Sequence, residues 1–399
     1  MLTRSGWGAI ALAITSFVIG RVFGIIELYV LGAGVLATIV VAVVTLLARP
    51  PRLAVRRLVE PSTVQAGDAA RVDIQIANTG TGRSPVVQLW EPVGRSGGAT
   101  MNLAPLRPHE RTVAAYRLPT AMRGVVQVGP MRARRRDVLG LAARSFAVPG
   151  SAELLVMPRH TPVRFTLGGS SGRLGDHLRM RAYGQSGSEF HSLREYVQGD
   201  DLRRISWKAS ARSNELIVTE TALEGVRRCT VVLDTSPTAG DATATSTATS
   251  TATAEAFERG VSAAASLVTG AAAAGLSTRM VAPDIDLRGH DVAPSTLRWL
   301  ATVAVGEGLL EHLPSLKAGE GMGIVLVVTE HAGTACAAGV RAALGPDDTL
   351  VVVATRSAVG HDRFVVDATS DDAFADSWAH LTGSLAAGPR LPAAYGAAG

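Results

Sequence analysis

Residues 187–212 decide how the rest of the chain can be arranged, and they read GSEFHSLREYVQGDDLRRISWKASAR. Only 18% of the whole chain is charged, yet nine of these 26 residues carry a charge. Apolar side chains such as Phe190 and Trp207 are interleaved with the charges. A purely solvated segment would lack such anchors, so we expect this stretch to fold against another part of the protein.

The spacing of apolar residues within the stretch predicts its local structure. Leu193, Tyr196 and Val197 are three and four residues apart, which predicts a short helix that Gly199 ends. The acidic pair at 200–201 would cap a second short turn. An extra strand is expected over residues 215–220.

The stretch resembles the signature of the domain of unknown function 58 family, in which GSEF, LREY, GDD, RI, W, K and AR follow in this order. Residues 137–141 and 155–159 resemble the segment that precedes this signature in the same family. The resemblance names no reaction. We take the following as signature and interaction residues: Gly187, Ser188, Glu189, Phe190, Arg194, Glu195, Tyr196, Gly199, Asp200, Asp201, Arg203, Arg204, Trp207, Lys208 and Arg212.

Composition limits the partners and the compartment. The 399 residues exceed a single small domain, and the net charge is +5. Lys occurs only at Lys208 and Lys317, so 37 of the 39 basic residues are Arg, which together with abundant Ala and Gly indicates coding bias. We therefore predict no nucleic-acid partner. Cys229 and Cys336 lack zinc-site spacing and are expected in the core, in a reducing compartment.

The first 50 residues contain two apolar runs, 6–24 and 28–48. The second is long enough to span a bilayer, and the first has Trp7 at one end and Arg21 near the other, as a second span would. A cleaved signal peptide is the alternative for the first run, but the span that follows favours a hairpin. Basic residues flank the pair on one side, which predicts an inner (plasma) membrane protein with both termini cytoplasmic. They are Arg4, Arg49, Arg52, Arg56 and Arg57.

Short alternating segments, with Pro and Gly about every ten residues, predict an immunoglobulin-like β-sandwich over 51–160. The expected strands are 72–76, 86–90, 112–118, 125–128, 142–148 and 153–157. A basic patch within this region has two interpretations: an edge strand that charge protects from aggregation, or a surface that contacts anionic lipid. It comprises Arg123, Arg132, Arg134, Arg135 and Arg136.

After residue 226, apolar strands alternate with helical patterns, which predicts a parallel sheet with helices on both faces. The expected strands are 229–233, 278–282, 324–328 and 350–354, and the expected helices are 254–274, 296–310, 334–344 and 372–385. No Gly-rich phosphate loop follows the first strand, so we expect no ATP hydrolysis. Residues 241–254 are low in complexity and are expected to form a mobile insertion.

The first of these strands is followed by Asp234-Thr-Ser-Pro-Thr238. This resembles the Asp-x-Ser-x-Ser metal loop of von Willebrand factor A domains, with Thr238 in place of the second serine. Glu330 stands where those domains place an aspartate. The resemblance implies Mg²⁺ held by Asp234, Ser236, Thr238 and Glu330, in a site that binds rather than catalyses. The alternative is that Asp234 and Ser236 only hold the loop by local hydrogen bonds.

The family resemblance implies a partnership with MoxR-type AAA+ ATPases. We therefore expect a membrane-anchored, non-enzymatic adaptor that also contacts membrane lipid. One alternative is a metal-dependent hydrolase built on Glu189, His191, Asp200, Asp201 and Lys208, although neighbouring arginines would neutralise its carboxylates. Another alternative is a cell-envelope scaffold for other membrane proteins.

The predicted organisation has five parts. They are two transmembrane helices (1–50), the sandwich (51–160), the signature segment (161–225), a von Willebrand factor A-like α/β domain (226–390) and a disordered tail (391–399). The position of the signature segment predicts a clasp between the two domains, docked by Phe190, Tyr196 and Trp207.

Overall fold

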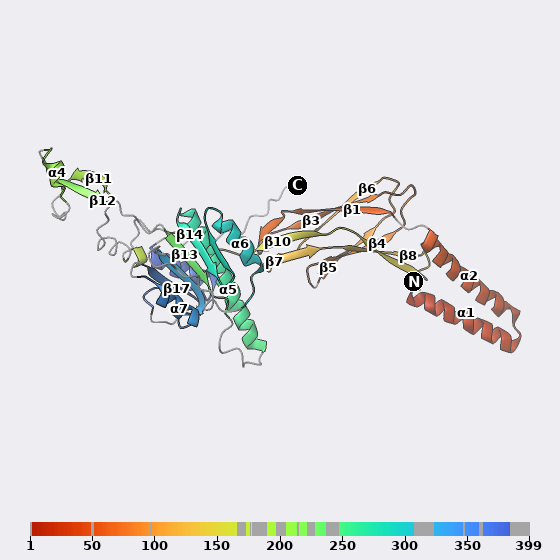
Figure 1. The fold of residues 1–399 in the computed structure, drawn as a ribbon. Coiled ribbons are helices and arrows are strands. Elements are labelled where there is room, and N and C mark those ends of the chain that lie inside the picture. Colours follow the sequence, from red (N-terminus) through yellow and green to blue (C-terminus); the bar gives the residue numbers. More distant parts are fainter. Residues whose placement is uncertain are drawn as a thin grey trace. The chain divides into compact units, whose positions relative to one another are not determined.

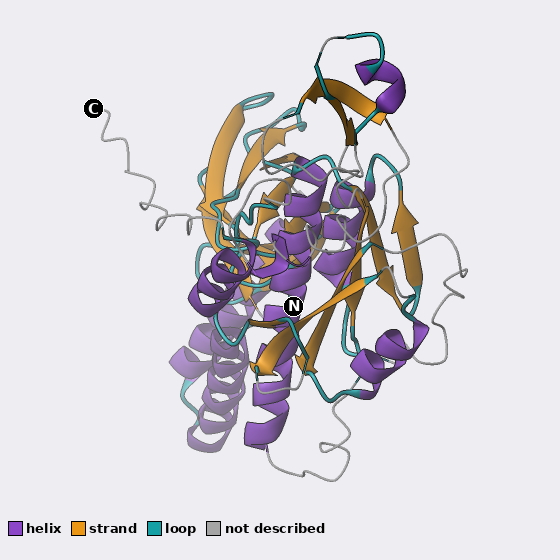
Figure 2. Ribbon diagram, turned by 90° about the vertical axis from the view of Figure 1, so that its left-hand side faces the viewer, coloured by secondary structure: helices purple, strands orange, loops and turns teal. Residues whose placement is uncertain are grey.

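The computed structural model describes residues 2–48, 52–95, 97–165, 173–175, 177, 190–196, 205–213, 215–221, 228–236, 247–306, 323–345, 348–358 and 362–383. The chain divides into two compact units, Met1–Met157 and Pro158–Gly399. The first unit contains a helical hairpin and a β-sandwich (Figure 1). The second contains an α/β sheet and a β-hairpin, whose strands and helices can be followed in Figure 2.

Two antiparallel helices open the first unit, α1 (Arg4–Phe23) and α2 (Ile26–Ala48). Both are long and apolar enough to cross a membrane, because twenty residues at about 1.5 Å each span about 30 Å. Gly24 ends α1 with a left-handed φ of 70°. The helices approach closely where a Cβ at Gly32 would lie 3.0 Å from the Phe17 ring. The predicted pair of apolar helices is therefore present.

Two sheets make up the sandwich. β1, β3 and β6 pair in that order, and the other sheet runs β2-β10-β7-β4-β8-β9, with β5 on β4. Strand bounds are β1 (Leu53–Glu60), β2 (Thr63–Gln65), β3 (Arg71–Asn78), β4 (Val87–Val93), β5 (Gly97–Leu103), β6 (Arg111–Arg117), β7 (Gly124–Val128), β8 (Met131–Arg136), β9 (Ala143–Val148) and β10 (Ala152–Met157). Alternate residues of β3 (Val72, Ile74 and Ile76) share one core with Leu89 and Leu154 of the facing sheet. The predicted β-sandwich is confirmed.

The arginine-rich strand β8 does not lie at an edge. It pairs with β4 on one side and β9 on the other, so the edge-strand interpretation of the basic patch is wrong. Met131 and Ala133 point into the core, which leaves Arg132, Arg134 and Arg136 exposed on the outer face. Strand alternation thus turns a run of arginines into a one-sided basic ladder.

A buried ion pair crosses between the two sheets. Arg57 of β1 donates from Nε to Oε1 of Glu91 on β4, and their side chains are 3% and 0% exposed. Tyr116 of β6 donates its hydroxyl to Oε2 of Glu91 at 2.7 Å. Burial, followed by this bond and the Glu91 charge, raises the pKa of Tyr116 above its usual range. Arg57, which the sequence places in the basic cluster after α2, is therefore paired inside the sandwich.

The second unit is built on a sheet with the order β15-β14-β13-β16-β17-β18, in which only the β14–β15 pair is antiparallel among the described strands. The elements are β13 (Arg228–Leu233), α5 (Thr247–Ala273), β14 (Ser277–Ala282), β15 (Ile285–Arg288), α6 (Val292–Thr302), β16 (Ile324–His331), α7 (Ala335–Ala343), β17 (Thr349–Ser357), β18 (Val365–Asp367) and α8 (Asp371–Thr382). One core lies under α5, α6 and α8, and another under α7. Helices therefore cover both faces, as predicted.

Helix α5 begins within the low-complexity segment. Residues 247–254 are its first two turns, so the expectation of a mobile insertion is wrong there, while 241–246 lie outside the described residues. Alanine has the highest helix propensity of any residue, and it alternates with threonine in these turns. Both cysteines are buried and free, as expected.

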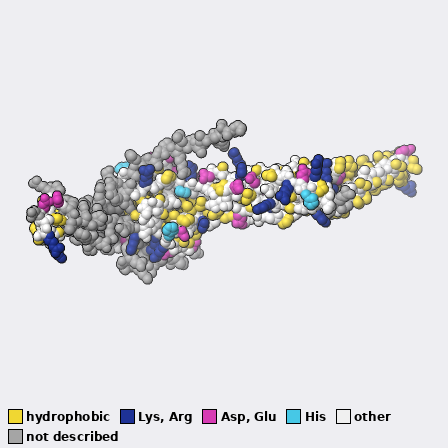
Figure 3. Space-filling model, turned by 90° about the horizontal axis from the view of Figure 1, so that it is seen from above, with side chains coloured by type: hydrophobic (Ala, Val, Ile, Leu, Met, Phe, Trp, Pro, Cys, Tyr) yellow, Lys and Arg dark blue, Asp and Glu magenta, His cyan; other side chains and the backbone are white. Residues whose placement is uncertain are grey.

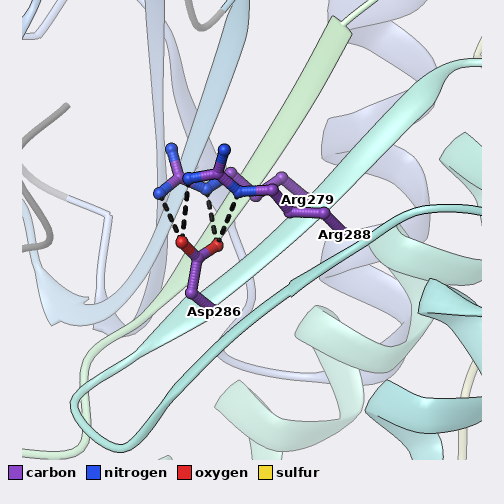
Figure 4. A network of polar contacts seen from close by, with 3 residues as sticks. All are labelled: Arg279, Asp286 and Arg288. Carbon is purple, nitrogen blue, oxygen red and sulfur yellow. Dashed lines mark hydrogen bonds and ion pairs between the residues drawn. The ribbon is translucent and has the colours of Figure 1, made fainter. Parts of the chain in front are cut away.

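The outer hairpin β14–β15 carries an ion network (Figure 4). Asp286 accepts hydrogen bonds of 2.7 and 2.8 Å from Arg279 and of 3.1 and 2.8 Å from Arg288. The bonds from Arg279, aided by those from Arg288 and opposed by burial, lower the pKa of Asp286 to about 2. This network ties the antiparallel strand β15 to the sheet.

Candidate functional site at the carboxyl edge of the parallel sheet

Two neighbouring parallel strands, β13 and β16, end at the same edge of the sheet. Leu233 pairs with Val328, and the Asp234 N–H continues the ladder by donating to the Val328 carbonyl at 2.9 Å. Asp234 therefore lies beside Thr329, which is 3% exposed. The carboxyl edge of a parallel sheet is the usual place for a ligand site in such folds.

A directed chain of hydrogen bonds ends on Asp234. Thr329 donates its hydroxyl to Oδ2 of Asp234 at 2.8 Å. Because that uses the only hydroxyl hydrogen of Thr329, the 2.8 Å contact between the Thr329 and Thr334 hydroxyls has Thr334 as donor. Thr334 is the N-cap of α7 and accepts from Ala337 N–H at 3.3 Å. Helix α7 thus fixes Thr334, Thr334 fixes Thr329, and Thr329 fixes the carboxylate.

The other groups around Asp234 are also donors. Oδ1 accepts the Ser236 N–H at 3.0 Å. Cys336 is 2% exposed and directs its thiol at Asp234. Burial, then the Asp234 charge and this bond, raise the pKa of Cys336 above its usual range, so the thiol stays protonated. An ionised carboxylate has about four lone-pair sites, and three donors among the described residues leave roughly one for a ligand.

These groups line a pocket of about 260 Å³. Asp234 and Ser236 form one side and the β16–α7 connection another, and α5 and the end of β17 contribute the apolar walls. The lining residues are Leu233, Asp234, Ser236, Thr253, Ala256, Phe257, Gly260, Val305, Val328, Thr329, Glu330, His331, Gly333, Thr334, Ala335, Cys336 and Thr355. The Asp234 carboxylate is therefore presented in a largely apolar concavity, which strengthens its interaction with a charged ligand.

Glu330, the expected fourth metal ligand, lines the pocket but is already paired. Its Oε2 lies 3.5 Å from Nη1 of Arg356, and its side chain is 14% exposed. A metal at this site would therefore compete with the Arg356 guanidinium for the charge of Glu330. Thr238, the expected third ligand, lies outside the described residues.

The oxygen atoms at this edge suit Mg²⁺ in kind. Asp234 offers a carboxylate, and Ser236 and Thr329 offer hydroxyls, which are hard ligands of the type that Mg²⁺ prefers. In the part of the chain that the structure describes, no three His, Cys, Asp or Glu side chains are placed to share a metal ion. Any Mg²⁺ held here would therefore depend on Asp234, hydroxyl groups and water.

Neither Thr329 nor Thr334 is assigned to this site from the sequence alone. A signal for Thr334 is in the sequence, since it directly precedes the apolar helical pattern of α7, as an N-cap does. Its contact with Thr329 depends on the turn after β16, which the sequence pattern does not specify.

The described part of the signature stretch contributes one strand and a short helix to a β-hairpin that the following strand completes. β11 (Phe190–Glu195) pairs antiparallel with β12 (Ile217–Thr221), and Tyr196 N–H donates to the Leu216 carbonyl at 2.8 Å. The predicted helix over 193–197 is therefore wrong, because pairing with β12 overrides a local spacing that also suits a helix. The expected strand over 215–220 is present as β12.

The helix α4 (Trp207–Ser210) follows Ser206, whose hydroxyl caps it by accepting from Ala209 N–H at 3.4 Å. Trp207 is 68% exposed, and Lys208 and Arg212 are exposed with it. The predicted docking of Trp207 on a neighbouring domain is wrong. The hairpin buries Ile205 against Val218 instead.

Of the hydrolase candidates, His191 lies in β11 and Lys208 in α4, and Arg194 and Glu195 share β11 with His191. The remaining signature residues lie outside the described residues: Gly187, Ser188, Glu189, Gly199, Asp200, Asp201, Arg203 and Arg204.

Residues 192–281 match the family model described as protein of unknown function DUF58. The chain carries a DUF58 segment. The resemblance drawn from the signature stretch is thereby confirmed. The DUF58 match runs from β11 to β14 and includes Asp234 and Ser236, so the signature hairpin and seven of the 17 residues that line the candidate pocket fall within it.

No curated protein matches the chain. Similar solved structures include the CARDB domain of a Pyrococcus furiosus protein in complex with di-metal ions, at 14% identity over 27% of this chain and 93% of that one, with a TM-score of 0.21. A putative ApaA protein from Bordetella pertussis is 16% identical over 27% of this chain and 96% of that one, with a TM-score of 0.19. A β-glucosidase from Erythrobacter marinus is 18% identical over 25% of this chain but only 16% of its own length, with a TM-score of 0.16.

Proposed function

We propose that the protein is a membrane-anchored, non-enzymatic adaptor whose α/β domain, von Willebrand factor A-like in its use of the Asp234 loop, binds a MoxR-type AAA+ ATPase. In this proposal α1 and α2 cross the inner (plasma) membrane, both termini are cytoplasmic, and the sandwich is immunoglobulin-like. The observation that supports it best is the chain of hydrogen bonds from α7 to Asp234 at the mouth of an open pocket.

This arrangement favours binding over catalysis. The Asp234 carboxylate is held on both oxygens: Oδ1 accepts from the Ser236 N–H of its own loop, and Oδ2 accepts from Thr329, which Thr334 links to α7. The nearby Cys336 thiol is kept protonated and is a poor nucleophile. A fixed carboxylate with one open direction suits a Mg²⁺ ion shared with a partner, or a cationic side chain of the partner. An adaptor needs only such a preorganised contact.

Co-purification tests the proposal. The full chain, extracted from membranes in mild detergent with Mg²⁺ present, is expected to retain the AAA+ ATPase. Asp234→Ala is expected to release the ATPase while leaving the protein in the membrane fraction. Asp286→Asn is the matched control, because Asp286 also accepts from fixed donors but does not line the pocket.

Failure to retain an AAA+ ATPase in the wild type would overturn the adaptor assignment. Equal retention by wild type and Asp234→Ala would place the contact elsewhere on the chain. Phosphodiester hydrolysis by the purified protein that Lys208→Ala abolishes would favour the hydrolase alternative.

A further inference from the structure

The turn between β8 and β9 is fixed to the start of the helical hairpin. Thr3 N–H donates to the Leu141 carbonyl at 3.0 Å, and the Thr3 hydroxyl donates to the Gly140 carbonyl at 2.5 Å. Leu2 forms an isolated antiparallel bridge with Ala142. The sandwich therefore contacts the hairpin at this turn as well as through the covalent link after α2.

The turn overlaps the ends of both apolar helices. Ala142 is fully buried in a cluster with Ala42 and Leu46 of α2. These two residues lie six and two positions before the end of α2, which is about 9 and 3 Å along the axis. In the first turn of α1, a Cβ at Gly6 would lie 2.1 Å from the Leu141 carbonyl oxygen. The turn thus lies level with the last turns of helices that are apolar enough to cross a bilayer.

The tip of this turn is apolar and exposed. Val138 is 103% exposed and Leu139 is 63% exposed. The turn is rigid, since Gly140 N–H donates to the Asp137 carbonyl at 3.1 Å and Leu139 N–H donates to Asp137 Oδ2 at 3.0 Å. Two large apolar side chains held out by a fixed turn are costly in water.

Exposed basic residues surround the tip. Arg136 lies two positions before Val138, with the half-buried Asp137 between them, and Arg134 lies two positions further along the same face of β8. Arg144 on β9 and Arg4 at the start of α1 are also exposed. Arg and Lys side chains gather where the apolar helices meet the sandwich (Figure 3). An apolar tip surrounded by arginines and located next to membrane-spanning helices is the arrangement expected of a segment that enters a lipid surface.

We propose that Val138 and Leu139 insert into the boundary between headgroups and acyl chains of an anionic bilayer, while Arg134 and Arg136 contact the lipid phosphates. This inference rests on the proposed membrane anchoring by α1 and α2. It adds a second lipid contact, made by the sandwich itself. The contact fixes how the sandwich is held at the membrane.

Site-specific fluorescence on the full chain tests the insertion. Leu139→Cys is labelled with an environment-sensitive fluorophore in nanodiscs of phosphatidylglycerol and phosphatidylcholine. Cys229 and Cys336 are buried, and burial raises the pKa of Cys229 to about 12, so the introduced thiol is labelled selectively. The expected result is a blue-shifted emission, loss of quenching by aqueous iodide and strong quenching by a shallow spin-labelled lipid.

Four further variants sharpen the test. Met122→Cys is the water-exposed control, because Met122 is 79% exposed and follows β6, whose last residue pairs with Arg71 at the end of the sheet away from α2. Gly34→Cys, in the middle of α2 with open space around it, reports the span itself. Adding Gly6→Ala to the Leu139 probe should displace the turn and restore iodide quenching. Gly8→Ala should not, because nothing lies within 4 Å of its Cβ position.

The outcomes separate the two proposals. A lipid-quenched Gly34 probe with an iodide-quenched Leu139 probe would overturn the insertion and leave the anchor intact. An iodide-quenched Gly34 probe would overturn the anchor and the insertion together. Equal lipid quenching of the Leu139 probe in neutral and anionic nanodiscs would refute the role given to Arg134 and Arg136.

Discussion

Replacing Glu91 by Gln should destabilise the sandwich by about 3–5 kcal/mol, the usual cost of leaving one member of a buried ion pair without its partner. Gln keeps the size of Glu91 and can still accept from Tyr116, so the change removes little except charge. The guanidinium of Arg57 would then be left in a site where its side chain is 3% exposed. The Nη2 atom of Arg57 has no hydrogen-bond partner among the described residues. Glu91 therefore supplies most of the interaction energy that offsets the cost of burying the guanidinium charge.

Hydrogen exchange of the full chain in detergent gives the measurement. Amides of β3 in the centre of its sheet exchange through opening of the whole sandwich, so a loss of 3 kcal/mol should speed their exchange about 100-fold. Glu60→Gln is the matched control, because Glu60 pairs with Arg71 at 3.7 Å with both side chains more than half exposed. That change should cost no more than about 0.5 kcal/mol. Equal exchange rates in the Glu91 and Glu60 variants would refute the reasoning.

Three more outcomes follow from the geometry. Thr329→Val keeps the shape of the side chain but removes the donor to Asp234, so protection of the α7 and β16 amides should fall by about 1.5–3 kcal/mol; unchanged protection would contradict the hydrogen-bond chain. The lowered pKa of Asp286 contributes stability that is present above the ordinary pKa of 3.8 and is lost as the pH falls toward about 2. Asp286→Asn should therefore remove this loss of stability in acid, at a cost of about 1 kcal/mol near neutral pH after allowance for solvent screening. Identical acid unfolding curves for the wild type and the variant would contradict this expectation. Trp207→Ala should change the free energy of unfolding by no more than about 0.5 kcal/mol, because Trp207 is 68% exposed. A large fall in melting temperature would instead support the hypothesis that Trp207 docks on a neighbouring domain.

Most of the fold could be predicted from local patterns. β13 and β16 are recognisable as continuous apolar runs, because both of their faces are buried. β3 is recognisable from its alternating pattern, because only one of its faces is buried. β8 was misplaced because strand order within a sheet depends on which strands pair, and its exposed arginines resemble those of an edge. The stretch around Leu193 has apolar spacing that suits a helix, and only its pairing with Ile217–Thr221 decides for a strand.

The candidate site was predictable only in part. Asp234 and Ser236 were found because they directly follow a recognisable strand. Thr334 is recognisable as the N-cap of α7, but it joins the site through a turn whose path is set by tertiary contacts, so no spacing rule predicts its contact with Thr329. The Arg356 partner of Glu330 comes from another strand and changes what Glu330 is able to do. Arg57 was similarly assigned to the basic cluster by its neighbours in sequence, whereas its burial follows from Glu91 on a different sheet.

The affinity of the nanodisc-embedded protein for a purified MoxR-type ATPase tests the adaptor proposal most directly. It should be measured for wild type and Asp234→Asn, with Mg²⁺ and with a chelator. Asp234→Asn retains the size of the side chain but removes its charge, so we expect about tenfold weaker binding or more, corresponding to the loss of a charge-assisted contact. Chelation should weaken wild-type binding and leave the variant unchanged if Mg²⁺ is shared at the pocket. Equal affinities for wild type and Asp234→Asn with Mg²⁺ present would contradict the role of the carboxyl-edge pocket in partner binding.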